Sequence, residues 1–259
     1  TPAQTLSLGP GRTAVAISTG KDHTCAILDD GTVSCWGANY YGQLGDGTTI
    51  DRSMPTQTLS LGAGRTAVSI HCGYEHTCVI LDNGTVSCWG RNYYGQIGDG
   101  THFGYRTTPT QTSSLGLGRT AVAISSGYYH TCAILDNGSV SCWGRNQYSS
   151  LGNGTSFNFR STPTQTSSLG LGRTAVAISS GYYHSCVILD DGTVSCWAYN
   201  GWGQLGDGTT IERSTPTQTS SLGLGRTATA ISSGASHTCV ILDDGTVSCW
   251  GAGGKGQLG

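Results

Sequence analysis

A chain of 259 residues is long enough to bury a substantial core, in one large all-β domain or two smaller ones. Its 41 glycines and only 11% charged residues disfavour long helices and suit short strands joined by glycine turns. The formal net charge of −2 and the lack of any apolar run near ~20 residues give no reason to expect nucleic-acid binding or membrane insertion. Because the chain opens at Thr1 without an initiator methionine, we interpret it as a mature or excised segment, and a longer parent repeat protein stays open.

A pattern of about 53 residues recurs five times along the chain. Its clearest marker is His-Thr-Cys or His-Ser-Cys, and successive copies lie 53, 54, 54 and 53 residues apart. The histidines that lead the marker are His23, His76, His130, His184 and His237. We expect a single repeat domain over residues 1–259, in units 1–53, 54–107, 108–161, 162–214 and 215–259.

The elements expected in each unit are all strands. An extended Thr-Pro-Thr-Gln-Thr run comes first, a Leu-Gly-x-Gly-Arg turn follows, and then an alternating strand such as residues 174–179. His-Thr-Cys-Ala-Ile-Leu and Thr-Val-Ser-Cys-Trp next flank an Asp-Asp-Gly or Asp-Asn-Gly loop, which is the strongest hairpin signal in the chain. About four strands in ~50 residues is the size of one propeller blade, so we expect an all-β propeller.

The repeat resembles that of the regulator of chromosome condensation (RCC1-like) family. The resemblance rests on Gly-x-x-His-Thr, Asp-Gly-Thr-Val-x-x-Trp-Gly and Asn-x-x-Gly-Gln-Leu-Gly, which recur in all five units. In the first unit these residues are Gly20, His23, Gly31, Trp36, Gly37, Asn39, Gly42, Gln43, Leu44 and Gly45. The resemblance implies a propeller, but the known family propellers have seven blades, and paired cysteines are not general in the family. Ala198 and Ser149-Ser150 also depart from the family pattern.

Ten of the eleven cysteines form pairs ten residues apart. A three-residue loop that pairs Leu28 with Thr32 would place Cys25 opposite Cys35, close to disulfide reach. We therefore predict one disulfide per hairpin and an oxidising, secreted or cell-surface setting. The predicted disulfide cysteines are Cys25, Cys35, Cys78, Cys88, Cys132, Cys142, Cys186, Cys196, Cys239 and Cys249. Zinc binding by His-x-Cys plus a second Cys is the rival interpretation, although the usual zinc spacings do not occur.

Cys72 is the unpaired thiol, either a small buried residue or a free or intermolecular thiol.

The remaining polar residues give little indication of a catalytic or metal site. Most acids stand in turns, and a histidine repeated in every copy suits a scaffold better than an active site. We expect no enzyme, no cofactor and no metal, since one carboxylate per Asp-Gly-Thr loop is too few for a calcium site. The sequons at Asn83, Asn137 and Asn153 leave glycosylation open.

Aromatic residues gather at the loop positions that differ between copies. They are either packing between blades or a contact surface, because tyrosine and tryptophan supply interface area with a polar handle. The candidate surface residues are Tyr74, Tyr93, Tyr94, Phe103, Tyr105, Tyr128, Tyr129, Tyr148, Phe157, Phe159, Tyr182, Tyr183 and Trp202.

Two functions follow from these patterns. The first is a non-enzymatic extracellular structural or adhesive repeat protein, a building block of a cell-surface or secreted filament. The alternative is a discrete binding module, lectin-like or inhibitor-like, that uses the aromatic loops. The expected partners are further copies of the chain, by head-to-tail strand exchange through residues 1–8, or another extracellular protein or glycan. The sequence is compatible both with a ring closed within one chain and with an open or polymeric form.

Overall fold

Five antiparallel sheets make up the described chain, which in this computed structural model comprises residues 4–259. The first strands of the sheets are β1 (Ala14–Thr19), β5 (Ala67–Cys72), β9 (Ala121–Ser126), β13 (Ala175–Ser180) and β17 (Ala228–Ser233). The second strands are β2 (His23–Leu28), β6 (His76–Leu81), β10 (His130–Leu135), β14 (His184–Leu189) and β18 (His237–Leu242). The third are β3 (Val33–Gly37), β7 (Val86–Arg91), β11 (Val140–Arg145), β15 (Val194–Ala198) and β19 (Val247–Gly251). The fourth are β4 (Arg52–Gln57), β8 (Tyr105–Gln111), β12 (Phe159–Gln165) and β16 (Arg213–Gln218).

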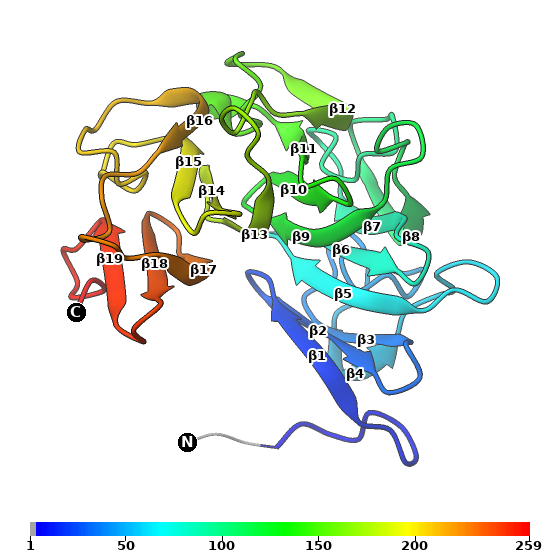
Figure 1. Ribbon diagram of the computed structural model, residues 1–259. Coiled ribbons are helices and arrows are strands. Elements are labelled where there is room, and N and C mark those ends of the chain that lie inside the picture. The colour runs from blue at the N-terminus through cyan, green and yellow to red at the C-terminus, as the bar shows by residue number, and fades with distance from the viewer. Residues whose placement is uncertain (1–3) are drawn as a thin grey trace.

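Each sheet is one propeller blade, with its strands hydrogen-bonded in chain order. The blades follow one another in an arc from the first to the last, and each first strand contacts the first strand of the next blade (Figure 1). The fourth strand of each four-stranded blade straddles a predicted unit boundary, as β4 does by beginning in the first unit and ending in the second. The predicted all-β propeller of five repeats is confirmed.

The hairpin register is the predicted one. The Leu28 N–H donates to the Thr32 carbonyl at 2.8 Å, and Cys25 lies opposite Cys35. The corresponding cysteine pairs form disulfides in all five blades, each with a sequence separation of 10. The prediction of one disulfide-stapled hairpin per blade is therefore confirmed.

The hydrophobic core lies between blades, not within them. In the first interface, Ile27, Val33 and Leu44 of the first blade pack with Ile70 and Trp89 of the second. Three further clusters join the second blade to the third, the third to the fourth and the fourth to the fifth. Among residues 4–259 no such cluster joins the fifth blade to the first, and the arc is open on that side (Figure 1).

The two departures from the repeat pattern keep the backbone of the glycines they replace. Ala198 has φ 87°, where Gly144 has φ 99°. Ser149 has φ 62°, and with Tyr148 it forms the short 3₁₀ helix η1 (Gln147–Ser149). No helix among the described residues is long and apolar enough to cross a membrane.

The fifth blade has three strands, β17, β18 and β19, in the described part of the chain. Residues 1–3 of the predicted exchange strand lie outside the described residues, and residues 4–13 carry no strand. The last sheet therefore presents the outer edge of β19 without a strand partner from residues 4–259.

Candidate functional site

A belt of backbone hydrogen bonds joins the loops between the first and second strands of successive blades. The N–H groups of Lys21, Tyr74, Tyr128 and Tyr182 each donate to a carbonyl of the next loop, at 3.2–3.3 Å. A glycine precedes each of these residues, because a Cβ there would collide with the buried histidine three residues later. The belt thus fixes the first residue of every loop at one end of the propeller axis.

The side chains on this belt form a tyrosine stack. The Tyr74 and Tyr128 rings are stacked with centroids 3.8 Å apart, and Tyr182 meets Tyr128 edge-to-face at 5.0 Å. Tyr129 and Tyr183, the next residues in the same loops, pack on Tyr128 at 4.2 and 5.6 Å. These distances fall in the range of favourable aromatic pairs, so the rings support one another across three blades.

The loops after the third strands bring a second row of rings to the same face. Tyr94 packs on Tyr129 at 5.3 Å, Tyr148 lies between Tyr183 and Tyr199, and Tyr41 meets Tyr93 at 6.5 Å. We call the whole set the tyrosine face. Its rings are Tyr41, Tyr74, Tyr93, Tyr94, Tyr128, Tyr129, Tyr148, Tyr182, Tyr183 and Tyr199. Only Tyr40 and Tyr105 of the 12 tyrosines stand outside it.

Two arginines stand among these rings. The Arg91 guanidinium lies 4.8–5.0 Å from the centroids of Tyr41, Tyr93 and Tyr129, and it pairs with Glu75. Arg145 lies 4.5 Å from the Tyr94 centroid and 5.7 Å from that of Tyr129. Among the described residues, no carboxylate forms an ion pair with Arg145. One of these two half-buried arginines is therefore paired with a carboxylate and the other is not. A third cation, Lys21, lies 4.8 Å from the Tyr74 centroid and pairs with Asp22.

A cavity of about 250 Å³ lies beside the stack. The glycines of the belt, with Tyr74, Tyr128 and Tyr182, form much of its wall, and His71 and Cys72 line it as well. Burial raises the pKa of the Tyr128 hydroxyl, so this group stays a neutral hydrogen-bond donor at any physiological pH. Such a hollow offers aromatic area, backbone polar groups and hydroxyls, the usual composition of a protein contact site.

The structure brings together eight of the thirteen predicted contact residues. They are Tyr74, Tyr93, Tyr94, Tyr128, Tyr129, Tyr148, Tyr182 and Tyr183. Phe103, in the loop before β8, and Phe159, the first residue of β12, instead flank His102, each at 4.4 Å. Tyr105 begins β8, and Phe157 is exposed in the loop before β12. Trp202 has the repeat position of Tyr94 and Tyr148 and is exposed, with no aromatic partner among the described residues.

Tyr41, Tyr199, Arg91 and Arg145 also belong to this face, although they are not among the residues predicted from the sequence. Arg91, Arg145 and Tyr199 each stand two residues after the repeated tryptophan, where the first and last units have alanine. The position thus varies between copies, and the criterion that selected the other contact residues would have found it if applied there.

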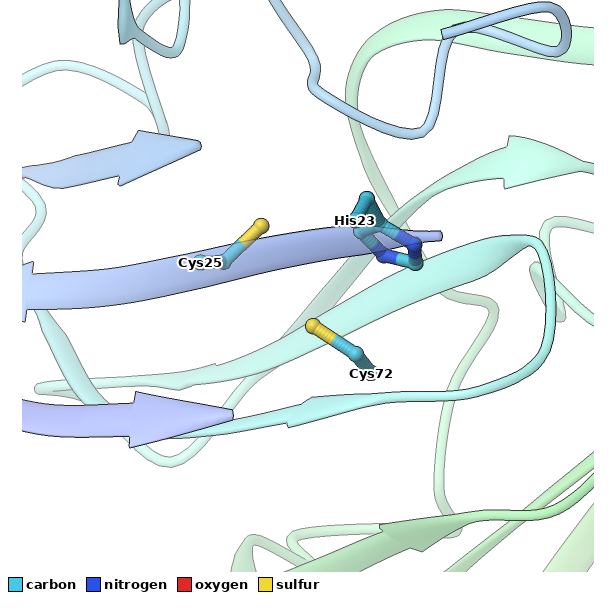
Figure 2. Close-up of side chains that lie close together, drawn as sticks. All are labelled: His23, Cys25 and Cys72. Atoms are coloured by element: carbon cyan, nitrogen blue, oxygen red, sulfur yellow. The ribbon is translucent and has the colours of Figure 1, made fainter. Parts of the chain in front are cut away.

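The remaining candidate groups are structural. Figure 2 shows His23, Cys25 and Cys72 close together, with ligand atoms within 4.8 Å of one another, where the first two blades meet. The Cys25 sulfur is already bonded to Cys35, and His23 Nε2 lies 2.9 Å from the Thr77 hydroxyl. Burial also raises the pKa of the Cys72 thiol to about 12. While the disulfide is intact, these three side chains pack between the blades and offer no thiolate for a metal.

Cys72 is free and buried, which fits the interpretation of a small buried residue.

The carboxylates of the Asp-Gly-Thr loops have hydrogen-bond partners within the protein. In the first blade Asp46 accepts hydrogen bonds from Thr48 and from Arg52 Nε, the latter at 2.7 Å. Such a carboxylate already has its partners, so this loop has little left to offer a calcium ion.

Comparison with known proteins identifies the repeat. A family model described as the regulator of chromosome condensation (RCC1) repeat matches residues 30–80, 83–134, 137–188 and 191–241. A second model of the same repeat matches residues 14–43, 67–96, 121–149, 175–204 and 228–257. The chain belongs to the RCC1 repeat family. The predicted resemblance is thereby confirmed, in a disulfide-bonded variant.

Curated relatives share about a third of their residues with this RCC1 repeat chain. It is 32% identical over 243 residues to the ultraviolet-B receptor UVR8 of Arabidopsis thaliana, covering 94% of this chain and 54% of UVR8. It is 35% identical over 296 residues to the probable E3 ubiquitin-protein ligase HERC4 of Homo sapiens, covering 94% of this chain and 27% of HERC4. The chain thus spans about half the length of these relatives, or less.

Solved structures share the fold at lower identity. Human WBSCR16 superposes with a TM-score of 0.82 at 22% identity, covering 96% of this chain and 64% of that one. The ectodomain of the Arabidopsis thaliana receptor kinase ACR4 gives a TM-score of 0.59 at 22% identity, covering 95% and 67%. At these identities the similarity shows the fold alone.

Proposed function

We propose that this RCC1 repeat propeller is a non-enzymatic extracellular binding module, and that the tyrosine face holds a protein partner. The observation that carries the proposal is the face itself, ten tyrosines from four blades with Arg91 and Arg145 among them. Tyrosine and arginine are among the residues enriched where proteins bind one another. Packing between blades would not require them, because the interblade cores are made by other residues.

The charge of the face indicates the chemistry of the partner. Glu75 neutralises Arg91, whereas Arg145 keeps a guanidinium available to a carboxylate from outside. A partner segment that places an acidic side chain on Arg145 and an apolar or aromatic one in the hollow beside Tyr128 would use both features. We therefore expect an acidic peptide segment of another extracellular protein, with an acidic glycan as the competing ligand.

Three observations support the other parts of the proposal. Five disulfides are typical of an oxidising compartment, which supports secretion or display on the cell surface. The same fold serves as the ectodomain of ACR4 and, in yeast RCC1 (Prp20), as a protein bound to Kap60, which are fold-level analogies. The chain covers only 27% of HERC4, so the ligase activity in that name does not carry over to it.

Peptide display tests the binding face. A phage library of random linear peptides is selected on the immobilised 259-residue chain, and the selected peptides are then measured against variants. We expect acidic sequences with an aromatic residue, whose affinity falls at least tenfold with Arg145→Gln and with Tyr182→Ala. Leu171→Ala is the control, because Leu171 is fully exposed in a turn and is not part of the tyrosine face. This change should leave the peptide affinity unaltered. Peptides that bind both variants as tightly as wild type would refute the proposal that the tyrosine face is the binding site. If the chain selects no peptide but binds acidic glycans on an array, the partner is a glycan and not a protein.

A structural role, as a building block of a cell-surface or secreted filament, is the second candidate function. It is favoured by a separate observation, the five near-identical blades that each carry one disulfide.

A further inference from the structure

The inference concerns the three Asn-x-Ser/Thr sequons, which begin at Asn83, Asn137 and Asn153. It rests on the secreted or cell-surface setting of the proposed function and does not depend on the tyrosine face. Such a tripeptide is the acceptor for N-linked glycans, which are bulky, hydrophilic and carried on surface loops. The structure distinguishes the three positions by their exposure and by the contacts of the side-chain amide.

Two of the sequons lie at the tips of hairpins in middle blades. Asn83 is in the loop between β6 and β7, Asn137 is in the loop between β10 and β11, and both residues are exposed. Asn83 Oδ1 accepts from the N–H and the hydroxyl of Thr85, at 3.1 and 2.8 Å. Asn137 Oδ1 accepts the same two bonds from Ser139. The amide oxygen therefore holds each turn, while Nδ2 has no hydrogen-bond partner among residues 4–259.

The turn itself does not require asparagine. The first, fourth and fifth blades have aspartate at this position. In the first blade Asp30 Oδ1 accepts the same two bonds from Thr32, and Asp30 Oδ2 also pairs with Arg12 at 3.0 Å. In the second blade Arg65 pairs with Asp82 alone. Asparagine thus makes the turn that aspartate makes and loses an ion pair, and the one group that it adds is an amide nitrogen.

The third sequon is placed differently. Asn153 is half-buried in the loop between β11 and β12, where three other blades have an aspartate whose side chain is only 4–7% exposed. The aspartates at the hairpin position are 28–31% exposed. Asn153 Oδ1 accepts from the N–H and the hydroxyl of Thr155, as the aspartates do in their loops. Its Nδ2 therefore has the place of Asp46 Oδ2, which accepts from Arg52 Nε at 2.7 Å.

The hairpin position also has space beside it. Asn137 lines a groove of about 460 Å³, whose walls include Leu117 and Pro163. Leu117 is fully exposed, so a bulky group on Asn137 has both this groove and the solvent next to it. A glycan on Asn153 would instead have to leave through a packed loop, because Gly154 N–H donates to the Ser214 carbonyl of the next blade at 2.9 Å.

We propose that Asn83 and Asn137 carry N-linked glycans and that Asn153 does not. The donor is a lipid-linked oligosaccharide diphosphate of the secretory pathway. The bond between the anomeric carbon of its first sugar and the diphosphate oxygen breaks, a bond from that carbon to Nδ2 forms, Nδ2 loses one proton, and the lipid diphosphate leaves. The amide oxygen is unchanged, so it still accepts from Thr85 or Ser139 and the turn is kept.

The two glycans stand at the end of the propeller opposite to the tyrosine face. In an antiparallel sheet with its strands in chain order, the loop between the second and third strands lies at one end and the other two loops lie at the other end. The tyrosine face is built from those other loops, since Tyr74 lies between β5 and β6 and Tyr94 lies between β7 and β8. Glycans on Asn83 and Asn137 therefore leave the tyrosine face free and keep the hairpin end in solvent.

Site mapping on the 259-residue chain, secreted from eukaryotic cells, tests the proposal. The secreted protein is treated in heavy-oxygen water with the amidase that removes N-glycans. The amidase converts each glycosylated asparagine to an aspartate that contains one heavy oxygen, and a sample incubated without amidase measures spontaneous deamidation. Peptide mapping by mass spectrometry locates the label. We expect it on Asn83 and Asn137 and not on Asn153.

Aspartate variants check the assignment by intact mass. Asn83→Asp and Asn137→Asp should fold, because other blades have aspartate at the same position. Each variant should lose the mass of one glycan, and the double variant should have the mass of the bare polypeptide. Asn153→Asp is the matched control, since it also gives its loop the residue of the other blades, and it should leave the glycan mass unchanged.

The outcomes separate this inference from the proposed function. Unlabelled Asn83 and Asn137 in secreted protein with five intact disulfides would overturn the glycan sites and leave the extracellular setting untouched. A glycan on Asn153 would show that exposure does not select among the sequons, which contradicts the proposal. Secreted protein whose cysteines stay reduced would refute the oxidising, extracellular setting on which the inference rests.

Discussion

At the scale of single residues, one backbone carbonyl in each of the first four blades explains much of the repeat pattern. The Gln43 carbonyl accepts from Trp89 Nε1 and from the Thr77 hydroxyl, both at 2.9 Å. Because the Thr77 proton goes to Gln43, its oxygen accepts from His23 Nε2–H, which fixes the tautomer of that histidine. The His-Thr-Cys and Cys-Trp motifs therefore recur as the parts of one interblade hydrogen-bond network.

Ala198 carries a residue-scale prediction, because it is a buried alanine at φ 87° where other blades have glycine. A left-handed conformation costs a residue with a Cβ ~1–2 kcal/mol, and glycine adopts it freely. In Ala198→Gly the strain that is relieved offsets the lost methyl packing and the extra chain entropy, so we expect a loss of less than about 0.5 kcal/mol. Chemical denaturation with the disulfides intact measures the change.

Ala175→Gly is the matched control for Ala198→Gly. Ala175 is 5% exposed in β13, where it has no positive φ. Glycine at this position loses the packing of the methyl group and relieves no backbone strain. We therefore expect the free energy of unfolding to fall by about 1–2 kcal/mol. Equal losses for the two variants would show that Ala198 is not strained.

At the scale of elements, the hairpin and its disulfide form one unit whose environment changes along the arc. The loop of Asp29, Asp30 and Gly31 sets the register, and the register places the cysteines opposite each other. In the first four blades the disulfide then lies in the core against the next blade. The fifth disulfide, Cys239–Cys249, has no following blade on it in the described chain and is half-buried.

The order of disulfide reduction tests this difference. Under limiting phosphine reductant at low protein concentration, Cys239 and Cys249 should be alkylated first, because reduction requires access to the sulfur. The buried pairs, such as Cys132–Cys142, should react at least tenfold more slowly under native conditions. Peptide mapping by mass spectrometry follows each pair. Simultaneous reduction of all five disulfides would mean that global unfolding, and not local exposure, controls access.

At the scale of the whole molecule, the sequence predicts the blades better than their arrangement. Hairpin register is local, so loop length and strand pattern suffice to pair Cys25 with Cys35. The contacts between blades join residues about a repeat apart, such as His76 and Thr131, and depend on how whole sheets pack. The tyrosine face was predicted only in part. The loop positions that vary between copies can be read from the sequence, but whether their side chains meet, as Arg91 and Tyr129 do, depends on how neighbouring blades pack.

Five blades joined by buried histidines should also make the whole molecule sensitive to acid. Burial lowers the pKa of His23 and His130 from 6.5 to about 4, and that of His76 and His184 to about 3. Nδ1 of His23, His76 and His184 has no hydrogen-bond partner, so a proton added there would be buried without an acceptor. The unfolded chain therefore binds more protons than the folded one between pH 6.5 and about 3 to 4.

We predict that the free energy of unfolding is highest above pH 6.5 and falls as the pH drops toward 4. Each of these histidines contributes at most about 1.4 kcal/mol per pH unit in that window. The aspartates affect the free energy of unfolding only at lower pH. Burial would raise the pKa of Asp46, but hydrogen bonds from Thr48 and Arg52 lower it on balance, so its stabilising effect is lost only below the unfolded value of 3.8. Denaturant unfolding at a series of pH values, with the disulfides intact, measures the slope.

His130→Gln separates the histidine effect from general acid sensitivity. Glutamine keeps a polar group near Ser185 but does not titrate, so the slope between pH 6.5 and 4 should fall by the share of one histidine, about 1 kcal/mol per pH unit. The comparison uses slopes, because the substitution also lowers stability at every pH. His102→Gln is the control, since His102 is exposed in a surface loop and its loss should leave the slope unchanged. A stability that stays constant from pH 7 to 4 would show that protonation of the buried histidines does not oppose folding.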